Sequence, residues 1–219
     1  MKKLILLIAG LMVLTTSAFA ANTEMNRDQS LIYVGYTPFG IDIPTLFSTP
    51  ISAGVYLGQN FLVAGDFGIP FDHDFTDSNN NTVNLKYLNM GGYGRWFPGT
   101  NSFNIFGGIH QRTLTLTGPV TYTNGGVSAT TTVEAKMSAM VADIGIGNQW
   151  ISDFGLTFGI DWFALRGVLA QTQSVSDSAG FATLPTQAEK DAVQEELKQF
   201  NTAFNSLPGL FIISVGWAF

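Results

Sequence analysis

The stretch "LFIISVGWAF", Leu210 to Phe219, alternates large apolar residues with small ones. The large residues are Phe211, Ile213, Val215, Trp217 and Phe219. Side chains two apart share one face of an extended strand, so this spacing predicts a strand with one apolar face and one crowded, small-residue face. Its last residue is aromatic, whereas soluble domains usually end in a few loose polar residues. The apolar face therefore needs an apolar environment to its very end.

The first twenty residues have the pattern of a secretory signal peptide. Two lysines precede the apolar run Leu4–Leu14, and Ala18–Ala20 form an A-x-A cleavage site. The run is shorter than the roughly 20 apolar residues of a membrane-spanning helix. We therefore expect an exported protein, with a signal peptide at 1–20 and one mature domain at 21–219.

The composition combines high hydrophobicity with export. Hydrophobic residues make up 46% of the chain and charged residues 12%, well below the roughly 25% of soluble domains. Without the two leading lysines, 8 basic side chains face 16 acidic ones, which argues against nucleic acid as a partner. Cysteine is absent, so no disulfide can stabilise the fold. A β-barrel, with lipid on one face of each strand, reconciles these properties.

The mature sequence contains eight segments of period two, each bounded by turn residues. They are Leu31–Phe39, Ile51–Gly58, Phe61–Ile69, Val83–Phe97, Ser102–Thr117, Thr132–Trp150, Phe154–Arg166 and Gly209–Phe219. Short connectors alternate strictly with long ones, namely Gly40–Pro50, Pro70–Thr82, Gly118–Thr131 and Gly167–Pro208. Outer-membrane barrels have this asymmetry. The expected fold is all-β, an eight-stranded antiparallel transmembrane up-and-down β-barrel; the alternative is a secreted sandwich.

Aromatic residues gather at the strand ends beside the short connectors, where a bilayer interface would lie. They are Phe61, Trp96, Phe97, Phe103, Trp150, Phe154, Trp217 and Phe219. The long connector 167–208 breaks the β pattern. Thr186 and Glu189 form a capping box, and Val193, Leu197, Phe200 and Phe204 follow at helical spacing. We expect a helix over 187–204 whose stripe packs on the barrel mouth; the alternative is a helix that binds a partner or the membrane.

Six charged or titratable residues fall on strand faces assigned to the lumen, Arg95 less firmly than the others because its segment fits either phase. They are Asp66, Arg95, His110, Arg112, Asp143 and Asp161. Eight strands leave an interior just wide enough for side chains to fill it, and buried charges must pair. The favoured interpretation is a structural salt-bridge network that fills the lumen. The alternative is a selectivity site in a pore.

Chemistry beyond this network is sparse in the sequence. With two histidines, His73 and His110, and no cysteine, zinc sites built on several of these ligands are excluded. Asp72, Asp74 and Asp77 could hold Ca²⁺ weakly, but their spacing lacks the glycine and distal glutamate of a calcium loop, so a solvated loop is favoured. We expect no catalytic site, no metal and no cofactor.

The alternating C-terminal residues Phe211, Ile213, Val215, Trp217 and Phe219 resemble the sorting signal of bacterial outer-membrane barrels. With the signal peptide and eight segments, the mature chain resembles the small eight-stranded barrels of the OmpA, OmpX and OmpW kind. That resemblance implies a bacterial outer-membrane location. It implies contact with outer-membrane lipid and lipopolysaccharide, and recognition by periplasmic chaperones and the barrel-assembly machinery. A monomer is expected.

Three functional classes remain open from the sequence. The first is a structural or surface-interaction protein, in which the barrel anchors and the extracellular loops make contacts. The second is a narrow channel for small or apolar solutes, as the OmpW resemblance allows. The third, least favoured, is a lipid-modifying barrel enzyme, because no serine has an evident place beside His110.

Overall fold

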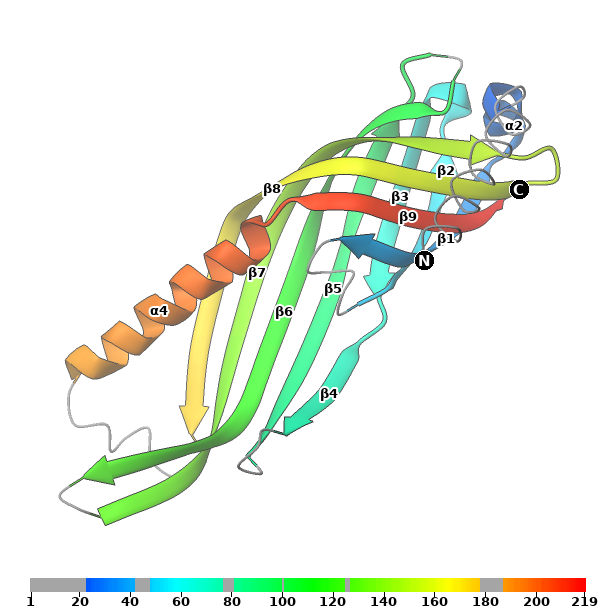
Figure 1. Cartoon of the computed structure of the whole chain (residues 1–219). Helices are drawn as coiled ribbons and strands as arrows, with labels where there is room; N and C mark the ends of the chain where they lie inside the picture. Colours follow the sequence, from blue (N-terminus) through cyan, green and yellow to red (C-terminus); the bar gives the residue numbers. More distant parts are fainter. Residues whose placement is uncertain (1–22, 42–47, 77–80, 100, 125–126, 178–186) are drawn as a thin grey trace, which may run out of the picture.

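The computed structural model describes residues 23–41, 48–76, 81–99, 101–124, 127–177 and 187–219 (Figure 1). Within these ranges nine strands are present: β1 Ile32–Ile41, β2 Pro50–Tyr56, β3 Phe61–Gly68, β4 Phe71–Thr76, β5 Thr82–Trp96, β6 Phe103–Asn124, β7 Val127–Ile151, β8 Leu156–Asp177 and β9 Gly209–Ala218. Two α-helices, α2 Thr23–Gln29 and α4 Gln187–Ser206, and the short 3₁₀ helix η1 Gly58–Asn60 complete the described part. The predicted signal peptide, residues 1–20, lies outside these ranges.

The strands form one antiparallel sheet that closes on itself. Its order is β3-β2-β1-β9-β8-β7-β6-β5-β4, and β3 also pairs with β5 from Phe61↔Trp96 to Phe67↔Met90. The prediction of an all-β, antiparallel, up-and-down fold with a helix before the last strand is therefore confirmed. The strand count of eight is wrong for the described residues, because a ninth strand, β4, pairs with β5 beyond the ring of the other eight.

Strand β4 lies in a segment predicted to be a loop, 70–82. Both β3 and β4 pair with β5, and the ladder breaks between Phe67↔Met90 and Phe71↔Tyr87. Pro70 falls in this break, and a proline has no N–H to donate to a ladder. Beyond it, Phe71, His73 and Phe75 restore an alternating pattern. Pro70, which the sequence analysis read as the start of a loop, therefore marks a break between β3 and β4, which both pair with β5.

The strands β6, β7 and β8 run far past the predicted ends. The β6–β7 ladder continues to Asn124↔Val127, so the predicted loop 118–131 is mostly a two-stranded ribbon. β8 pairs with β7 as far as Val133↔Asp177. Threonine and valine are frequent in these stretches, and β-branched residues favour strands. Figure 1 shows these strands projecting well beyond the end of the ring. We call this projecting part the extension: it comprises β4, the residues of β5 that pair with β4 (Thr82–Tyr87), and the parts of β6, β7 and β8 that continue alongside and past them.

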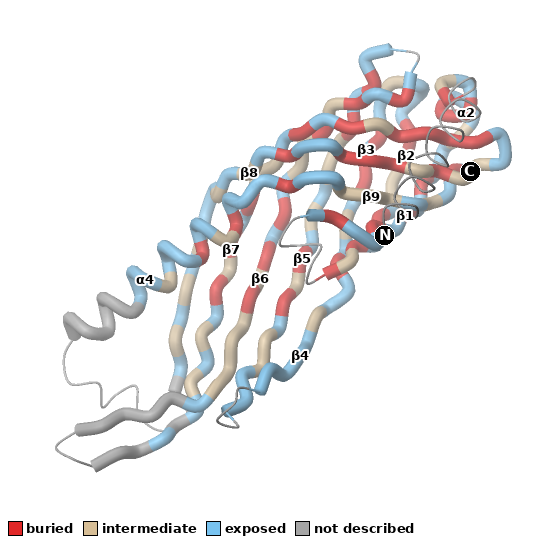
Figure 2. Tube along the Cα trace, viewed as in Figure 1, coloured by how far each residue is buried: buried red, intermediate tan, exposed pale blue. Residues whose placement is uncertain are grey.

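The outward face of the ring is apolar. Registered rows cross it, such as Trp96–Ile105–Ile146–Phe163 and Gly94–Gly107–Ile144–Leu165. Ile144 is 58% exposed and Leu165 is 56% exposed. Exposed large apolar residues on the same face also include Val34, Ile51, Val63, Phe67, Ile109 and Val215. We call this continuous surface the apolar band. Figure 2 shows buried and exposed positions alternating along the strands of the ring.

The polarity of the two sheet faces inverts in the extension. Its outward rows are polar: Asp72–Lys86–Thr115–Lys136–Ser174 and Asp74–Asn84–Thr117–Glu134–Ser176. Its inward rows are mainly apolar, as in Phe71–Tyr87–Leu114–Met137. Tyr87 and Met137 are each 1% exposed. The same strands are thus apolar outside along the ring and apolar inside along the extension.

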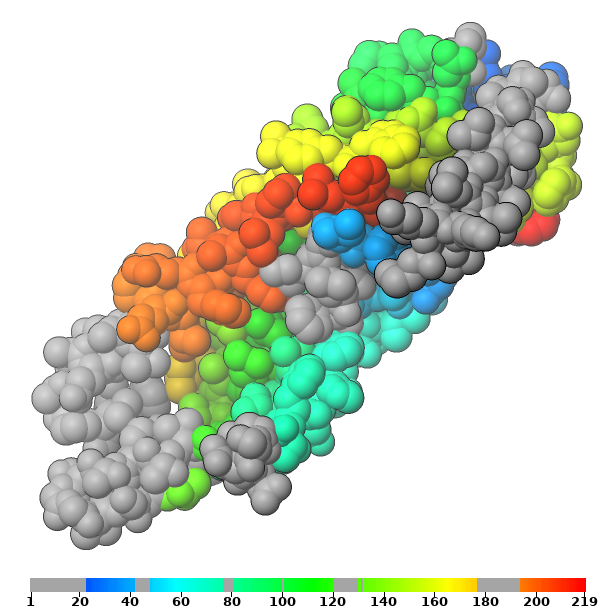
Figure 3. Space-filling view, in the orientation of Figure 1, coloured from blue at the N-terminus to red at the C-terminus, as the bar shows by residue number. Residues whose placement is uncertain are grey.

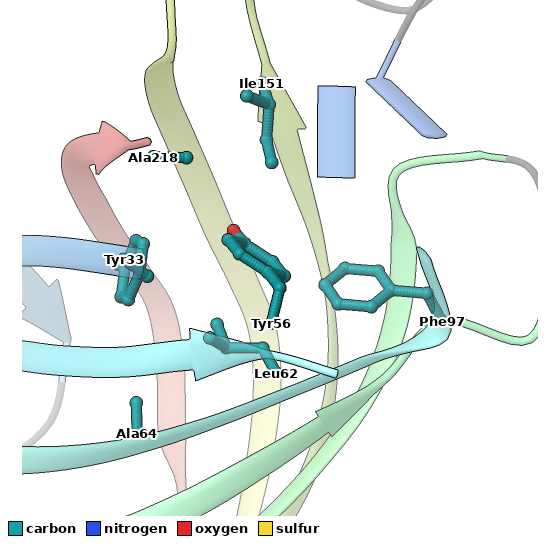
Figure 4. Close-up of a cluster of buried hydrophobic side chains, with 7 residues drawn as sticks. All are labelled: Tyr33, Tyr56, Leu62, Ala64, Phe97, Ile151 and Ala218. Carbon is teal, nitrogen blue, oxygen red and sulfur yellow. The ribbon is translucent and has the colours of Figure 1, made fainter. Parts of the chain in front are cut away.

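The end of the ring beside the short turns is filled from within. Tyr33, Tyr56, Leu62, Ala64, Phe97, Ile151 and Ala218 form one buried cluster (Figure 4). The placement of Phe97 in an outward aromatic girdle is therefore wrong, and Trp150 is also buried, stacked on Phe158 with ring centroids 5.8 Å apart. Of the other predicted girdle residues, Phe61, Trp96, Phe103, Phe154, Trp217 and Phe219 are exposed.

Helix α2, which the sequence analysis did not anticipate, lies against this filled end. Asn26 donates its side-chain N–H to the Ile151 carbonyl at 2.9 Å, and Arg27 Nε donates to the Gln59 carbonyl at 2.8 Å. The Arg27 guanidinium also lies 4.2 Å from the centre of the Phe97 ring. Burial lowers the pKa of Arg27 from its ordinary value. These contacts fix the start of the described chain to the short turns.

Helix α4 packs against the inner face of the extension. Leu197 and Phe204 contact the cluster of Tyr87, Leu114 and Met137, and the Tyr87 and Phe204 ring centroids are 6.2 Å apart. Thr202 and Gln171 exchange side-chain hydrogen bonds. The expectation that the helical stripe packs on the barrel mouth agrees with these two residues, while Phe200 is 48% exposed and the Val193 side chain lies outside the described part.

Candidate functional site, a polar layer inside the ring

A chamber of about 80 Å³ lies inside the ring, between two apolar layers. All six charged residues assigned to the lumen from sequence line it: Asp66, Arg95, His110, Arg112, Asp143 and Asp161. They come from β3, β5, β6, β7 and β8, so strands from opposite walls of the ring meet here. Below the chamber lies the cluster around Tyr56 and Phe97, and above it the cluster around Tyr87 and Phe204.

Arg95 and Asp161 form a bidentate ion pair across the ring of strands. Arg95 Nη1 donates to Asp161 Oδ1 at 2.5 Å and Nη2 donates to Oδ2 at 2.8 Å. Arg95 Nη1 also donates to Asn104 Oδ1 at 2.9 Å. The guanidinium lies about 5 Å from the ring centres of Tyr93, at 5.1 Å, and Phe106, at 5.0 Å. Planar contact and paired hydrogen bonds suit arginine better than lysine at such a position.

His110 lies between two carboxylates. Its Nε2 is 3.3 Å from Asp66 Oδ2, and its Nδ1 is 3.2 Å from Asp143 Oδ2. Ser52 donates its hydroxyl to Asp66 Oδ1 at 2.5 Å. The serine therefore bonds the carboxylate rather than the imidazole, which is not the order of a Ser-His-Asp catalytic arrangement. The geometry suits a linked charge network.

Sequence reasoning missed one charged lining residue, Arg166. Strict alternation from Asp161 places residue 166 on the outward face. The β7–β8 register, however, shifts between Ile146 and Gly147, so Trp162 and Phe163 both point outward, at 39% and 37% exposure, and the phase of β8 reverses after them. Two adjacent bulky aromatics are the signal of that irregularity. Arg166 thus joins Arg95 and Arg112, and three arginines balance the three aspartates of the chamber.

The other candidate residues lie apart from the chamber. Asp72 and Asp74 stand on the outward face of β4, where Asn84 donates its side-chain N–H to both at 2.7 Å, and Asp77 lies outside the described residues. Within the described ranges, no group of three histidine, aspartate or glutamate side chains is placed to hold a metal ion. The interpretation of 72–77 as a solvated loop is wrong for 72–76, which form strand β4.

Four of the five alternating C-terminal residues lie on β9, and Phe219 directly follows it. Phe211, Val215, Trp217 and Phe219 are exposed, from 39% for Val215 to 63% for Phe219, and Ile213 is partly buried. Phe211 has a positive φ of 49°, at a bulge where its ring meets Trp162 edge-on. The Phe219 carbonyl accepts from the N–H of Ile32 at 3.0 Å, so the end of β9 is tied to the start of β1.

Comparison with known proteins places the chain in no family. No family model matches it, and no curated protein matches it. Among solved structures it is similar to that of Acinetobacter baumannii CarO, at 11% sequence identity and a TM-score of 0.48, over 87% of this chain and 97% of that one. In the described part of the chain, neither α-helix combines the length and hydropathy that a membrane span requires.

The pair of Arg95 and Asp161 gives the first testable prediction. Asp161→Ala leaves a buried guanidinium without its carboxylate, which costs about 3–5 kcal/mol in the free energy of unfolding. Urea titration of the refolded protein measures this as a lower midpoint. Asp72→Ala, at an exposed carboxylate, is the matched control and should leave the midpoint nearly unchanged.

The double variant Arg95→Met/Asp161→Leu shows whether the loss of stability comes from an unpaired buried charge or from altered packing at Asp161. Removing both charges restores most of the loss, because an apolar pair of similar volume needs no partner. An Asp161→Ala midpoint equal to the parent's contradicts a buried pair.

Proposed function

We propose that this chain is a bacterial outer-membrane protein whose eight-strand ring spans the bilayer as a barrel and whose extension stands outside it as a contact surface. The inversion of polarity along the strands carries this proposal. A large apolar outward surface is tolerated where lipid meets it, and it ends where water begins. The polar rows through Lys86 and Lys136 mark that limit on β5 and β7.

The dimensions of the apolar band suit a bilayer. On β5 the outward face is free of charge from Leu88 to Trp96, a span of nine residues. A tilted membrane strand needs about 9–11 residues. Closure also matters, because the hydrocarbon core offers no water to an unpaired strand edge and the ring leaves none.

The filled interior favours an anchor over a channel. Aromatic and aliphatic side chains occupy the ring near the short turns, and α2 lies over that end. The charged layer above them is paired, as at Arg95 and Asp161. A solute entering from the extension would meet this closed floor. The contact role therefore falls to the extension and α4, with lipid and lipopolysaccharide around the ring.

Planar-bilayer recording tests the anchor against the narrow channel. The refolded protein should show no stable, reproducible conductance, since opening a path requires displacing Tyr56, Phe97 and the Arg95–Asp161 pair. The sample must first show heat-modifiable migration in SDS gels, because folded barrels resist SDS until boiled. Uniform single-channel steps from such a sample contradict the anchor and favour the channel. An unshifted band with recovery in the soluble periplasmic fraction contradicts the membrane location.

Substitution of Phe219 tests the proposed assembly signal, which the periplasmic chaperones and the barrel-assembly machinery would recognise. Phe219 is 63% exposed, so Phe219→Ala should lower the free energy of unfolding by less than the roughly 1.5–3 kcal/mol of full phenylalanine burial. The refolded variant should keep near-normal stability in detergent, while its amount in the outer membrane falls sharply at high expression. Phe154→Ala, at an equally exposed ring near the same rim, is the matched control. Equal assembly of Phe219→Ala and the parent overturns the signal.

A further inference from the structure

Strand β4 forms one edge of the extension. It pairs with β5 from Phe71↔Tyr87 to Thr76↔Thr82, and on its other side no strand of the described residues pairs with it. Figure 1 shows β4 bordering the open side of the extension, across from α4. An unpaired edge presents a row of backbone N–H and C=O groups that another extended segment can pair with. Within the ring each strand pairs on both sides. The opposite edge of the extension, β8 beyond Ala164, lies beside α4, where Thr202 bonds Gln171.

The inward face of β4 carries an aromatic row. The ring centroids of Phe71 and His73 are 5.9 Å apart, and those of His73 and Phe75 are 4.8 Å apart. This row continues the buried cluster around Tyr87, but it is not fully covered: Phe75 is 48% exposed and Val83 is 38% exposed. Figure 3 shows a hollow between α4 and β4 on this side. An added strand could cover the row with apolar side chains.

The outward face of β4 carries two carboxylates. Lys86 lies 3.2 Å from Asp72, and Asn84 donates to both Asp72 and Asp74. The hydrogen bonds from Asn84 and Lys86 hold the pKa of Asp72 below its ordinary value, so this carboxyl is ionised at neutral pH. Two negative charges thus face one positive charge. A second copy of β4 would add two more carboxylates, and like charges on paired strands repel.

We propose that β4 binds an extended peptide of a partner protein, whose basic residues alternate with apolar ones, as an added strand of the extension. The basic side chains meet Asp72 and Asp74 on the outward face, and the apolar ones cover Phe75 and Val83 on the inward face. Backbone hydrogen bonds supply the affinity and the alternating side chains supply the specificity. This inference rests on the proposed function, which leaves the extension in water.

The test uses the refolded full mature chain and a synthetic peptide of alternating lysine and valine, with binding followed by fluorescence anisotropy. Three peptides control for charge and composition: alternating glutamate and valine, the same lysines and valines in two blocks, and the alternating peptide methylated on every backbone nitrogen. The alternating lysine peptide should bind more tightly than each of these. Equal binding of the methylated or block peptide overturns the proposal, since it indicates attraction to an acidic protein without strand addition.

Substitutions locate the site. Asp72→Asn/Asp74→Asn should weaken binding about three- to tenfold, as expected for two exposed ion pairs. Glu195→Gln/Glu196→Gln on α4 removes the same charge elsewhere and should leave binding unchanged. Asp72→Lys/Asp74→Lys should reverse the preference in favour of the glutamate peptide. Equal effects of the two neutralised pairs contradict a site on β4.

The heat-modifiable gel shift, measured on the same samples, separates the two failures. Shifted protein that binds none of the peptides overturns this inference alone. Protein that shows no gel shift contradicts the proposed function, and with it the inference, which rests on that function.

Discussion

The pairing of β3 with β5 closes the sheet, and the rest of the structure depends on it. Seven registered residue pairs, Phe61↔Trp96 to Phe67↔Met90, join the two strands. Without them the ring has two open edges, which a hydrocarbon environment does not tolerate. Closure also gives the sheet an inside, so that alternate residues meet one another across the ring. The line of strands breaks at Pro70, and from there β4 leaves the ring as an edge.

Inside the ring, layers of different chemistry follow one another along the strands. An aromatic and aliphatic floor and a paired charged layer fill the ring, and an apolar layer completed by α4 follows in the extension. The charges are stable because they are enclosed together: Arg95 meets Asp161, and His110 meets both Asp66 and Asp143. Buried charges that pair poorly would cost far more than they return. The layers make the ring a filled support for the extension.

Alternation predicted most of the ring, because a period of two directly reports which residues share a face. The same reasoning placed Asp66, His110, Arg112, Asp143 and Asp161 in one cluster, and the structure brings them together with Arg95. It failed where alternation is interrupted. The bulge at Trp162 and Phe163 reverses which residues of β8 face inward, so Arg166 was assigned to the outward face. Pro70 suggested a loop where β4 follows. It also could not place Phe97 or α2, since their positions depend on contacts distant in sequence, such as Asn26 with Ile151.

Spin-label accessibility along the outward face of β7 tests the central claim most directly. Ile144 and Lys136 share that face eight residues apart, and a chain without cysteine allows single labels at each position. In liposomes, a label at Ile144→Cys should be accessible to oxygen, which partitions into lipid, and shielded from a water-soluble nickel chelate. A label at Lys136→Cys should show the opposite. Equal access of the nickel chelate to both labels contradicts a membrane boundary between them.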